Sequence, residues 1–247
     1  MVKMLALLLV AAAVTRGQNA DDFQKLSGEQ RVARARAAHG QIIAQKFKDA
    51  GLPYPSREIF LCWFKREAVV ELWAREDGGR FQLVATYPIL ATSGGPGPKR
   101  REGDGQVPEG FYEIDRFNPE SRFHLSLRLN YPNAADRILS DRERPGGEIF
   151  IHGSNVSIGC APLGDAAIEQ LYLAALDTRS RGQTRIAVHV FSTRMQGAEW
   201  TAFAAEHPAL APFWQQLQPA YEAFERDRLV PAFTVAPDGS YRVQPAR

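Results

Sequence analysis

The chain has 247 residues, of which 45% are hydrophobic and 23% are charged, and its formal net charge is +2. This globular composition excludes disorder throughout, and the length allows one sizeable core. The short basic run at residues 99–101 is soon followed by Glu102 and Asp104. Without a larger block of like charge, the sequence argues against nucleic acid or a membrane surface as a partner.

The first twenty residues predict a secretory signal peptide. Lys3 precedes an apolar run from Met4 to Val14, and small and polar residues follow up to Ala20. These 11 apolar residues are too few for a bilayer, which needs roughly 20. We therefore expect cleavage near residue 18 or 21, no stable membrane span afterwards, and a periplasmic protein. Loss of Lys3 and Arg16, with no acidic residue, lowers the formal charge from +2 to zero.

Helix and strand patterns follow in chain order. Apolar residues at helical spacing predict a helix over residues 27–51, and a run of alternating and continuous apolar segments predicts a meander of antiparallel strands. The Gly- and Pro-rich segment 94–110 predicts a long loop. The predicted strands cover residues 58–65, 68–75, 81–91, 111–117, 123–129, 148–152 and 185–191.

The second half of the chain adds helices. Residues 165–178 predict an amphipathic helix, and residues 197–229 predict helical structure divided by Pro208, Pro212 and Pro219. Residues 233–243 predict a small hairpin or an ordered tail. The aromatic residues of the helical segment predict core or a docking surface, with a sugar-stacking platform as the alternative; they are Trp200, Phe213, Trp214 and Tyr221.

The two cysteines lie in different environments. Cys62 lies in an apolar run that is typical of a buried strand, whereas Cys160 lies in a turn next to glycine. Although an exported protein can form disulfides, we expect both thiols to be free. The five scattered histidines and two unlike cysteines have no metal-ligand spacing, so no metal or other cofactor is expected. His124 and His189 lie in strand patterns and are expected to be sheet histidines.

The segment from Ile149 to Cys160 carries the candidate chemistry. His152 ends a predicted strand, and Cys160 follows eight residues later on a glycine turn. An imidazole can take the proton of a nearby thiol or stabilise its thiolate, and N–H groups around Gly159 and Cys160 can face a developing oxyanion. The alternative is that His152 caps a strand and Cys160 fills a gap in the core.

Several separated segments resemble the L,D-transpeptidase catalytic domain (YkuD) family, and within it the YafK-like branch. They occur in the family's order between about residues 55 and 195. The segments are Trp63-Phe64-Lys65-Arg66-Glu67, Glu71-Leu72-Trp73, Gly97-Pro98-Lys99, Glu102-Gly103-Asp104-Gly105, Pro108-Glu109-Gly110-Phe111-Tyr112, Asn118-Pro119, Tyr131-Pro132-Asn133, Ile151-His152-Gly153 and Ser157-Ile158-Gly159-Cys160.

The resemblance implies roles for individual residues. Cys160 matches the family's nucleophile and His152 its base, which the main-chain carbonyl of Gly153 would orient. Gly153, Gly159 and Ser157 would support the oxyanion and the backbone, and the weaker substrate-binding candidates at the pocket rim are Lys99, Glu102 and Asp104. Two positions depart from many members, because Ile158 replaces a histidine and Pro162 replaces an arginine that would suit a carboxylate.

The resemblance also implies a fold and a function. The expected fold is a β-rich α+β, twisted, mostly antiparallel β-sandwich with flanking helices, divided into residues 1–20, 21–52, 53–195 (catalytic) and 196–247 (helical extension and tail). The expected activity is L,D-transpeptidation of peptidoglycan stem peptides through a thioester, with a wall-linked lipoprotein as a further partner. An L,D-carboxypeptidase or amidase and a non-catalytic peptidoglycan-binding module are the alternatives. Papain-like and NlpC-like peptidases are disfavoured because their cysteine precedes the histidine.

Overall fold

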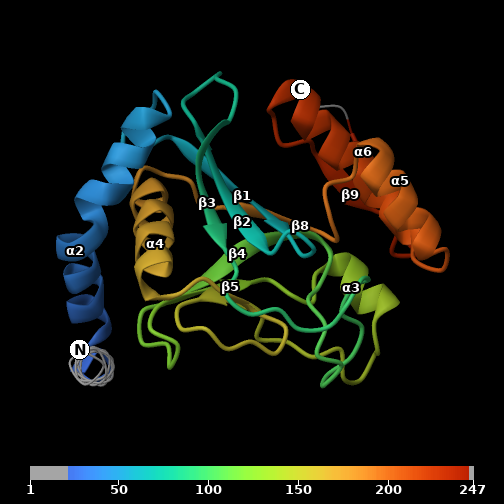
Figure 1. Cartoon of the computed structure of the whole chain (residues 1–247), viewed down its shortest axis with the longest axis horizontal. Helices are drawn as coiled ribbons and strands as arrows, with labels where there is room; N and C mark the ends of the chain where they lie inside the picture. Colours follow the sequence, from blue (N-terminus) through green and yellow to red (C-terminus); the bar gives the residue numbers. More distant parts are fainter. Residues whose placement is uncertain (1–21, 245–247) are drawn as a thin grey trace, which may run out of the picture.

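The computed structural model describes residues 22–244, and its centre is one curled sheet of eight strands (Figure 1). The strand order is β3-β2-β1-β8-β4-β5-β6-β7. The pairs β1·β8 and β6·β7 are parallel and the other pairs are antiparallel. The predicted β-rich α+β fold is therefore confirmed. The strands are β1 (Glu58–Phe64), β2 (Val69–Arg75), β3 (Gln82–Pro88), β4 (Gly110–Asn118), β5 (Ser126–Leu129), β6 (Phe150–His152), β7 (Ala161–Pro162) and β8 (Ala187–Phe191).

The central strand β1 is buried on both faces of the sheet. Its alternate residues Ile59, Leu61 and Trp63 belong to one apolar cluster. The intervening residues belong to a second cluster and are Phe60, Cys62 and Phe64. Because successive side chains of a strand point to opposite faces, this double burial explains why the sequence of β1 is continuously apolar rather than alternating.

Two helices cover one face of the sheet. Helices α2 (Gly28–Asp49) and α4 (Asp165–Ser180) pack side by side on the left of Figure 1. Ser27 caps α2 by accepting a hydrogen bond from the main-chain N–H of Gln30. Gly51 follows the helix with φ of +75°, a conformation that glycine adopts without strain. The predicted helix over residues 27–51 is confirmed.

The C-terminal helices lie on the other side of the sheet. Helices α5 (Gly197–Glu206) and α6 (Ala211–Asp227) are on the right of Figure 1, and a hairpin of β9 (Phe233–Val235) and β10 (Tyr241–Val243) follows them. Three of the four aromatic residues singled out there are buried in the second cluster, and Phe213 packs against it. Their interpretation as core is therefore confirmed.

Three local expectations differ from the structure. The short helix α3 (Ala134–Leu139) was not predicted, although Asn133 and Asp136 form a capping box at its start. His124 lies in a turn before β5 with φ of +75°, so its expected place in a strand is wrong. Pro219 lies inside α6 and does not divide it. His189 lies in β8 as expected.

The predicted signal peptide lies outside the described residues. Within residues 22–244, no helix combines the length and apolar character that a membrane crossing requires.

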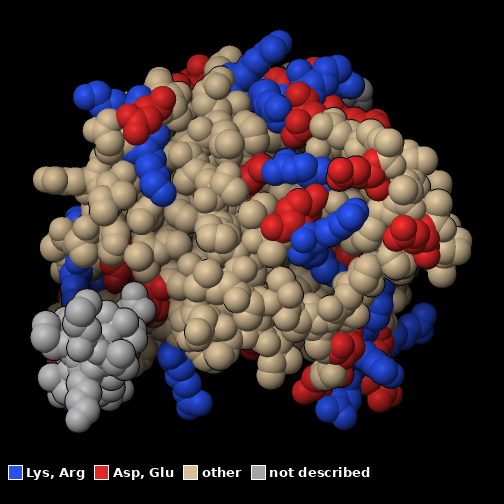
Figure 2. Space-filling model, viewed as in Figure 1, with Lys and Arg blue, Asp and Glu red and all other residues tan. Residues whose placement is uncertain are grey.

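Figure 2 shows lysine and arginine side chains interspersed with aspartate and glutamate around a wide uncharged area of the visible face. The ion pairs of the described residues include many such neighbours, for example Arg144 with Glu102.

Candidate active site

Strand pairing brings the two candidate residues to the same edge of the sheet. β6 ends at His152, and β7 begins one residue after Cys160. The two strands are parallel, with Ile151 opposite Ala161 and His152 opposite Pro162. This register makes Cys160 a diagonal neighbour of His152. The eight-residue spacing is thus the length of the connection between two adjacent short strands.

The imidazole of His152 is buried and oriented by the main chain. Its side chain belongs to a residue that is 2% exposed, and Nδ1 lies 2.5 Å from the carbonyl oxygen of Gly153. Because a carbonyl only accepts, Nδ1 must carry the proton and Nε2 is left as a proton acceptor. Burial lowers the pKa of His152, and the bond to Gly153 opposes that effect. The ring also packs on Phe123, with centroids 4.8 Å apart.

The surroundings of Cys160 favour the neutral thiol over the thiolate. Burial raises the pKa of Cys160; a main-chain hydrogen bond from Phe150 and the charge of Lys99 oppose the rise, whereas Glu148 adds to it. Sγ donates to the carbonyl oxygen of Glu148 over 3.7 Å. Among the hydrogen bonds of residues 22–244, none joins Cys160 to His152. The thiol must therefore leave Glu148 before it can give its proton to the imidazole.

Two hydroxyl groups hold the turn before Cys160. Ser157 Oγ accepts from the N–H of Cys160 at 3.0 Å and donates to the carbonyl of the same residue at 2.7 Å. The N–H of Gly159 donates to Ser93 Oγ at 2.6 Å. Gly159 has φ of +95°, and an added Cβ would lie 2.9 Å from the carbonyl oxygen of Gln106. Both N–H groups expected to face an oxyanion therefore bind hydroxyl groups in this state.

Gly153 lies where three neighbours approach closely. An added Cβ would lie 2.7 Å from Asp165 Oδ1, 2.7 Å from the Cβ of His124 and 2.8 Å from the carbonyl oxygen of Phe123. The N–H of the next residue, Ser154, donates to Asp165 Oδ1 at 2.8 Å. The start of α4 therefore fixes the backbone that orients His152, and a larger residue at position 153 would displace it.

Glu169 and two histidines form a cluster next to the backbone of Gly153 and Ser154. Glu169 of α4 lies 2.6 Å from His124 Nε2 and 2.5 Å from His39 Nδ1 of α2. The hydrogen bonds from both histidines lower the pKa of Glu169, although burial acts in the opposite direction. His124 Nδ1 lies 3.7 Å from Asp165 Oδ2, so the cluster extends to the residue that holds the Ser154 N–H. Sequence patterns gave no sign that these residues meet.

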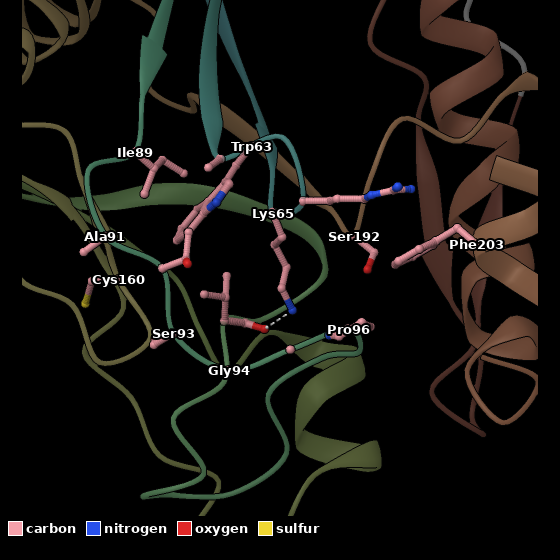
Figure 3. Close-up of a pocket in the computed structure, with 15 residues that line it drawn as sticks. Trp63, Lys65, Ile89, Ala91, Ser93, Gly94, Pro96, Cys160, Ser192 and Phe203 are labelled. Atoms are coloured by element: carbon pink, nitrogen blue, oxygen red, sulfur yellow. Dashed lines mark hydrogen bonds between the residues drawn. The ribbon is translucent and has the colours of Figure 1, made fainter. Parts of the chain in front are cut away.

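Cys160 lies on the wall of a cavity of about 360 Å³ (Figure 3). The long loop 94–110, the ends of β1 and β8, and α5 all contribute to the wall. No Asp or Glu lines the cavity, and His152 is not among its lining residues. These are Trp63, Lys65, Arg66, Ala68, Ile89, Ala91, Thr92, Ser93, Gly94, Gly95, Pro96, Val107, Cys160, Ser192 and Phe203.

The three charged candidates at the rim do not line this cavity. Lys99 Nζ donates to Asp104 Oδ1 at 2.7 Å and to the carbonyl of Arg101 at 2.8 Å. Asp104 also accepts three main-chain N–H groups. Burial acts to raise its pKa, but the bond from Lys99 and these three bonds lower it to about 2. Glu102 pairs with exposed Arg144. Lys99 and Asp104 therefore organise the loop, whereas Glu102 lies on its surface.

The two positions that depart from the family pattern have different surroundings. Ile158 is 84% exposed, and Pro162 is buried in β7 opposite His152. The cavity instead has Arg66, which belongs to one of the matched segments but was not singled out. Ser93 was also missed, because only the folded chain brings it to Gly159.

The chain is similar to known proteins over much of its length. The pattern of the YkuD family, described as the L,D-transpeptidase catalytic domain, matches residues 65–188. YafK of Escherichia coli (strain K12), whose name assigns it provisionally to the L,D-transpeptidases, is 33% identical over 203 residues, which are 81% of this chain and 78% of YafK.

The chain is also similar to two solved structures at low sequence identity and low TM-score. The helical cell shape determining protein Pgp2 of Campylobacter jejuni is 21% identical with a TM-score of 0.46, covering 68% of this chain and 60% of Pgp2. Bd1075 of Bdellovibrio bacteriovorus is 19% identical with a TM-score of 0.40, covering 69% of this chain and 60% of Bd1075. On the family match and the similarity to YafK, the chain belongs to the YkuD family of L,D-transpeptidase catalytic domains.

Proposed function

We propose that the protein is a peptidoglycan L,D-transpeptidase in which Cys160 is the nucleophile and His152 the general base. The observation that supports the proposal is the pairing of β6 with β7, in which Cys160 of the cavity wall is a diagonal neighbour of His152, whose Nδ1 is bonded to Gly153. The family match supports peptidoglycan as the polymer. Export through residues 1–20 to the periplasm would bring the enzyme to that polymer.

The proposed reaction proceeds through a thioester. The Cys160 proton passes to His152 Nε2 as sulfur attacks the amide carbonyl of the third residue of a stem peptide, a diamino acid. The C–N bond then breaks, the departing amine takes the proton from His152, and an acyl-cysteine remains. An incoming amine then attacks the thioester as His152 Nε2 takes its proton. The C–S bond breaks, and His152 returns that proton to the sulfur of Cys160. No cofactor takes part in this scheme.

Water in place of the incoming amine would make the protein an L,D-carboxypeptidase or amidase. This second function is favoured by the partial exposure of Cys160, since a thioester at this position is within reach of solvent. A lipoprotein linked to the wall is a candidate substrate or acceptor for either outcome. The same acyl-enzyme serves both, and the partition depends on how well an acceptor excludes water.

The test is intact-protein mass spectrometry of residues 21–247 with tetrapeptide stem fragments. We expect a mass increase equal to the acyl group in the wild type and none in Cys160→Ala. Cys62→Ala is the matched control, because Cys62 is a free but fully buried thiol and its loss should leave the adduct intact. The released products separate transfer from hydrolysis. No adduct and no product across several stem types would instead support the non-catalytic binding module.

A further inference from the structure

One peptide group of the chain binds the proposed base on one side and a carboxylate on the other. The carbonyl oxygen of Gly153 lies 2.5 Å from His152 Nδ1. The nitrogen of the same peptide group belongs to Ser154, and its N–H donates to Asp165 Oδ1 at 2.8 Å. Because the carbonyl and the N–H are conjugated through the C–N bond, a hydrogen bond at one end polarises the other end. The base and the carboxylate are therefore linked through a single peptide group.

The backbone around this peptide group is fixed at two further points. The carbonyl of His152 accepts from the N–H of Leu163 at 2.8 Å, and the carbonyl of Ser154 accepts from the N–H of Gly164 at 3.0 Å. Ser154 has φ of +62°, a left-handed conformation that is unfavourable for a residue with a Cβ. The bond to Asp165 helps to hold Ser154 in that conformation, so it keeps the peptide group facing both of its partners.

The second oxygen of Asp165 faces a histidine. Oδ2 lies 3.7 Å from His124 Nδ1, which is longer than a hydrogen bond. His124 Nε2 in turn lies 2.6 Å from Glu169, which also contacts His39 of α2. The side chain of Asp165 is 50% exposed, so solvent also reaches the carboxylate. The bond from the Ser154 N–H is the only hydrogen bond of the Asp165 side chain within residues 22–244.

From this geometry we infer that Asp165 is a positioning residue for the proposed base and acts through the Gly153–Ser154 peptide group. The arrangement corresponds to a nucleophile–histidine–carboxylate triad with one peptide group inserted between the histidine and the carboxylate. No proton crosses the peptide group. As His152 takes the thiol proton, its Nδ1–H becomes a stronger donor to the carbonyl, and the polarised N–H of Ser154 becomes a stronger donor to Asp165. The negative charge of Asp165 thus stabilises the imidazolium. The inference rests on the proposed function for the role of His152 as a base.

The test measures the protonation of His152 apart from activity. NMR titration of residues 21–247 carrying Cys160→Ala gives the pKa of the imidazole and the chemical shift of the Ser154 amide proton. Asp165→Asn keeps an oxygen that can accept from Ser154 but removes the charge. We therefore expect the His152 pKa to fall by about half a unit or more and the amide proton to move upfield. Glu222→Gln, which removes an exposed carboxylate of α6, should change neither.

In the active protein, Asp165→Asn should affect kcat more than KM. We expect kcat for a stem peptide to fall about threefold or more, which corresponds to half a pKa unit, while KM changes little. The acidic limb of kcat/KM should move to lower pH, because that limb reports protonation of the base and loss of a negative charge favours the neutral imidazole. Asp165→Ser is also uncharged, should act in the same direction, and replaces Asp165→Asn if that variant does not fold.

The outcomes separate this role from helix stabilisation and from the proposed function. Asp165 is also the first residue of α4, where a negative charge favours the helix. If Asp165→Asn lowers Tm but leaves the His152 pKa and the Ser154 amide shift as in Glu222→Gln, the inference is overturned even if the wild type forms an acyl-enzyme. A lowered His152 pKa, without any acyl-enzyme in the wild type, would support the link through the peptide group and reject catalysis.

Discussion

Burial of the proposed nucleophile and of the proposed base affects the proton transfer that the pair would make. It lowers the pKa of His152 and raises that of Cys160, so the uncharged pair is favoured at rest. A preformed thiolate–imidazolium pair would need the opposite shifts. The structure therefore supports a mechanism in which His152 removes the thiol proton during attack, and Nδ1–H bonded to Gly153 keeps the accepting nitrogen in place.

This uncharged pair predicts a particular pH dependence. The base form of His152 must be neutral, and its pKa is below the ordinary 6.5, so kcat/KM should fall only as the pH drops through a midpoint below 6.5. Alkylation of Cys160 by iodoacetamide, followed in a Cys62→Ala background, should have its midpoint above 9 because burial raises the thiol pKa. A reactive thiolate below pH 7 would contradict the general-base mechanism.

At the scale of elements, the contact of Glu169 with His39 and His124 joins α2, α4 and the turn before β5. Glu169→Gln should lower the free energy of unfolding by about 3 kcal/mol at pH 7, since two charge-assisted bonds of a buried carboxylate are lost. The pKa of Glu169 is depressed in the folded state. Its carboxylate therefore stabilises the protein fully at pH values above the ordinary pKa of 4.5, and progressively less as the pH falls below that value. The difference in free energy of unfolding between Glu169→Gln and the wild type should therefore be smaller at acidic pH.

Urea unfolding of both proteins at pH 7 and pH 4 checks this expectation. The matched control is Glu222→Gln, because Glu222 is an exposed helix carboxylate that accepts a hydrogen bond from Gln218 four residues before it. We expect that change to cost less than about 1 kcal/mol at either pH. If Glu169→Gln lowers the free energy of unfolding by no more than this control does, the histidine contacts do not stabilise the packing of α2 on α4.

The elements that could be predicted from the sequence are those whose structure depends mainly on their own residues. The apolar run of β1, the capped helix α2 and the glycine loop 94–110 follow from local pattern, and the position of His152 and Cys160 follows from their spacing. Pro219 was misjudged because the apolar face of α6, with Leu217 and Tyr221 buried against the sheet, outweighs a cost of about 3 kcal/mol for an internal proline. Contacts such as Ser93 with Gly159 join distant segments, and no local pattern contains them.

At the scale of the whole molecule, one buried carboxylate connects the cavity to the C-terminal helices. Glu109 accepts from Lys65 Nζ, from the N–H of Gly97 at 3.0 Å and from Trp214 Nε1 at 2.6 Å. The loop that lines the cavity is therefore tied both to the end of β1 and to α6. Residues beyond 195 share the second apolar cluster with β1 and β8, so the proposed catalytic domain and its extension depend on the same core.

Replacing Trp214 with phenylalanine tests this connection. The change removes the hydrogen bond to Glu109, leaves one carboxylate oxygen buried without that donor, and should lower the free energy of unfolding by about 2 kcal/mol beyond the loss of ring contacts. Trp200→Phe is the matched control, because Trp200 lies in the same aromatic cluster and no hydrogen bond of its indole is found in residues 22–244. Chemical unfolding and steady-state kinetics of the two variants should separate the effects. Because Glu109 holds the loop at Gly97, KM for a stem peptide should rise more in Trp214→Phe than in Trp200→Phe. Equal changes of KM in both variants would mean that the helices support the cavity through packing alone.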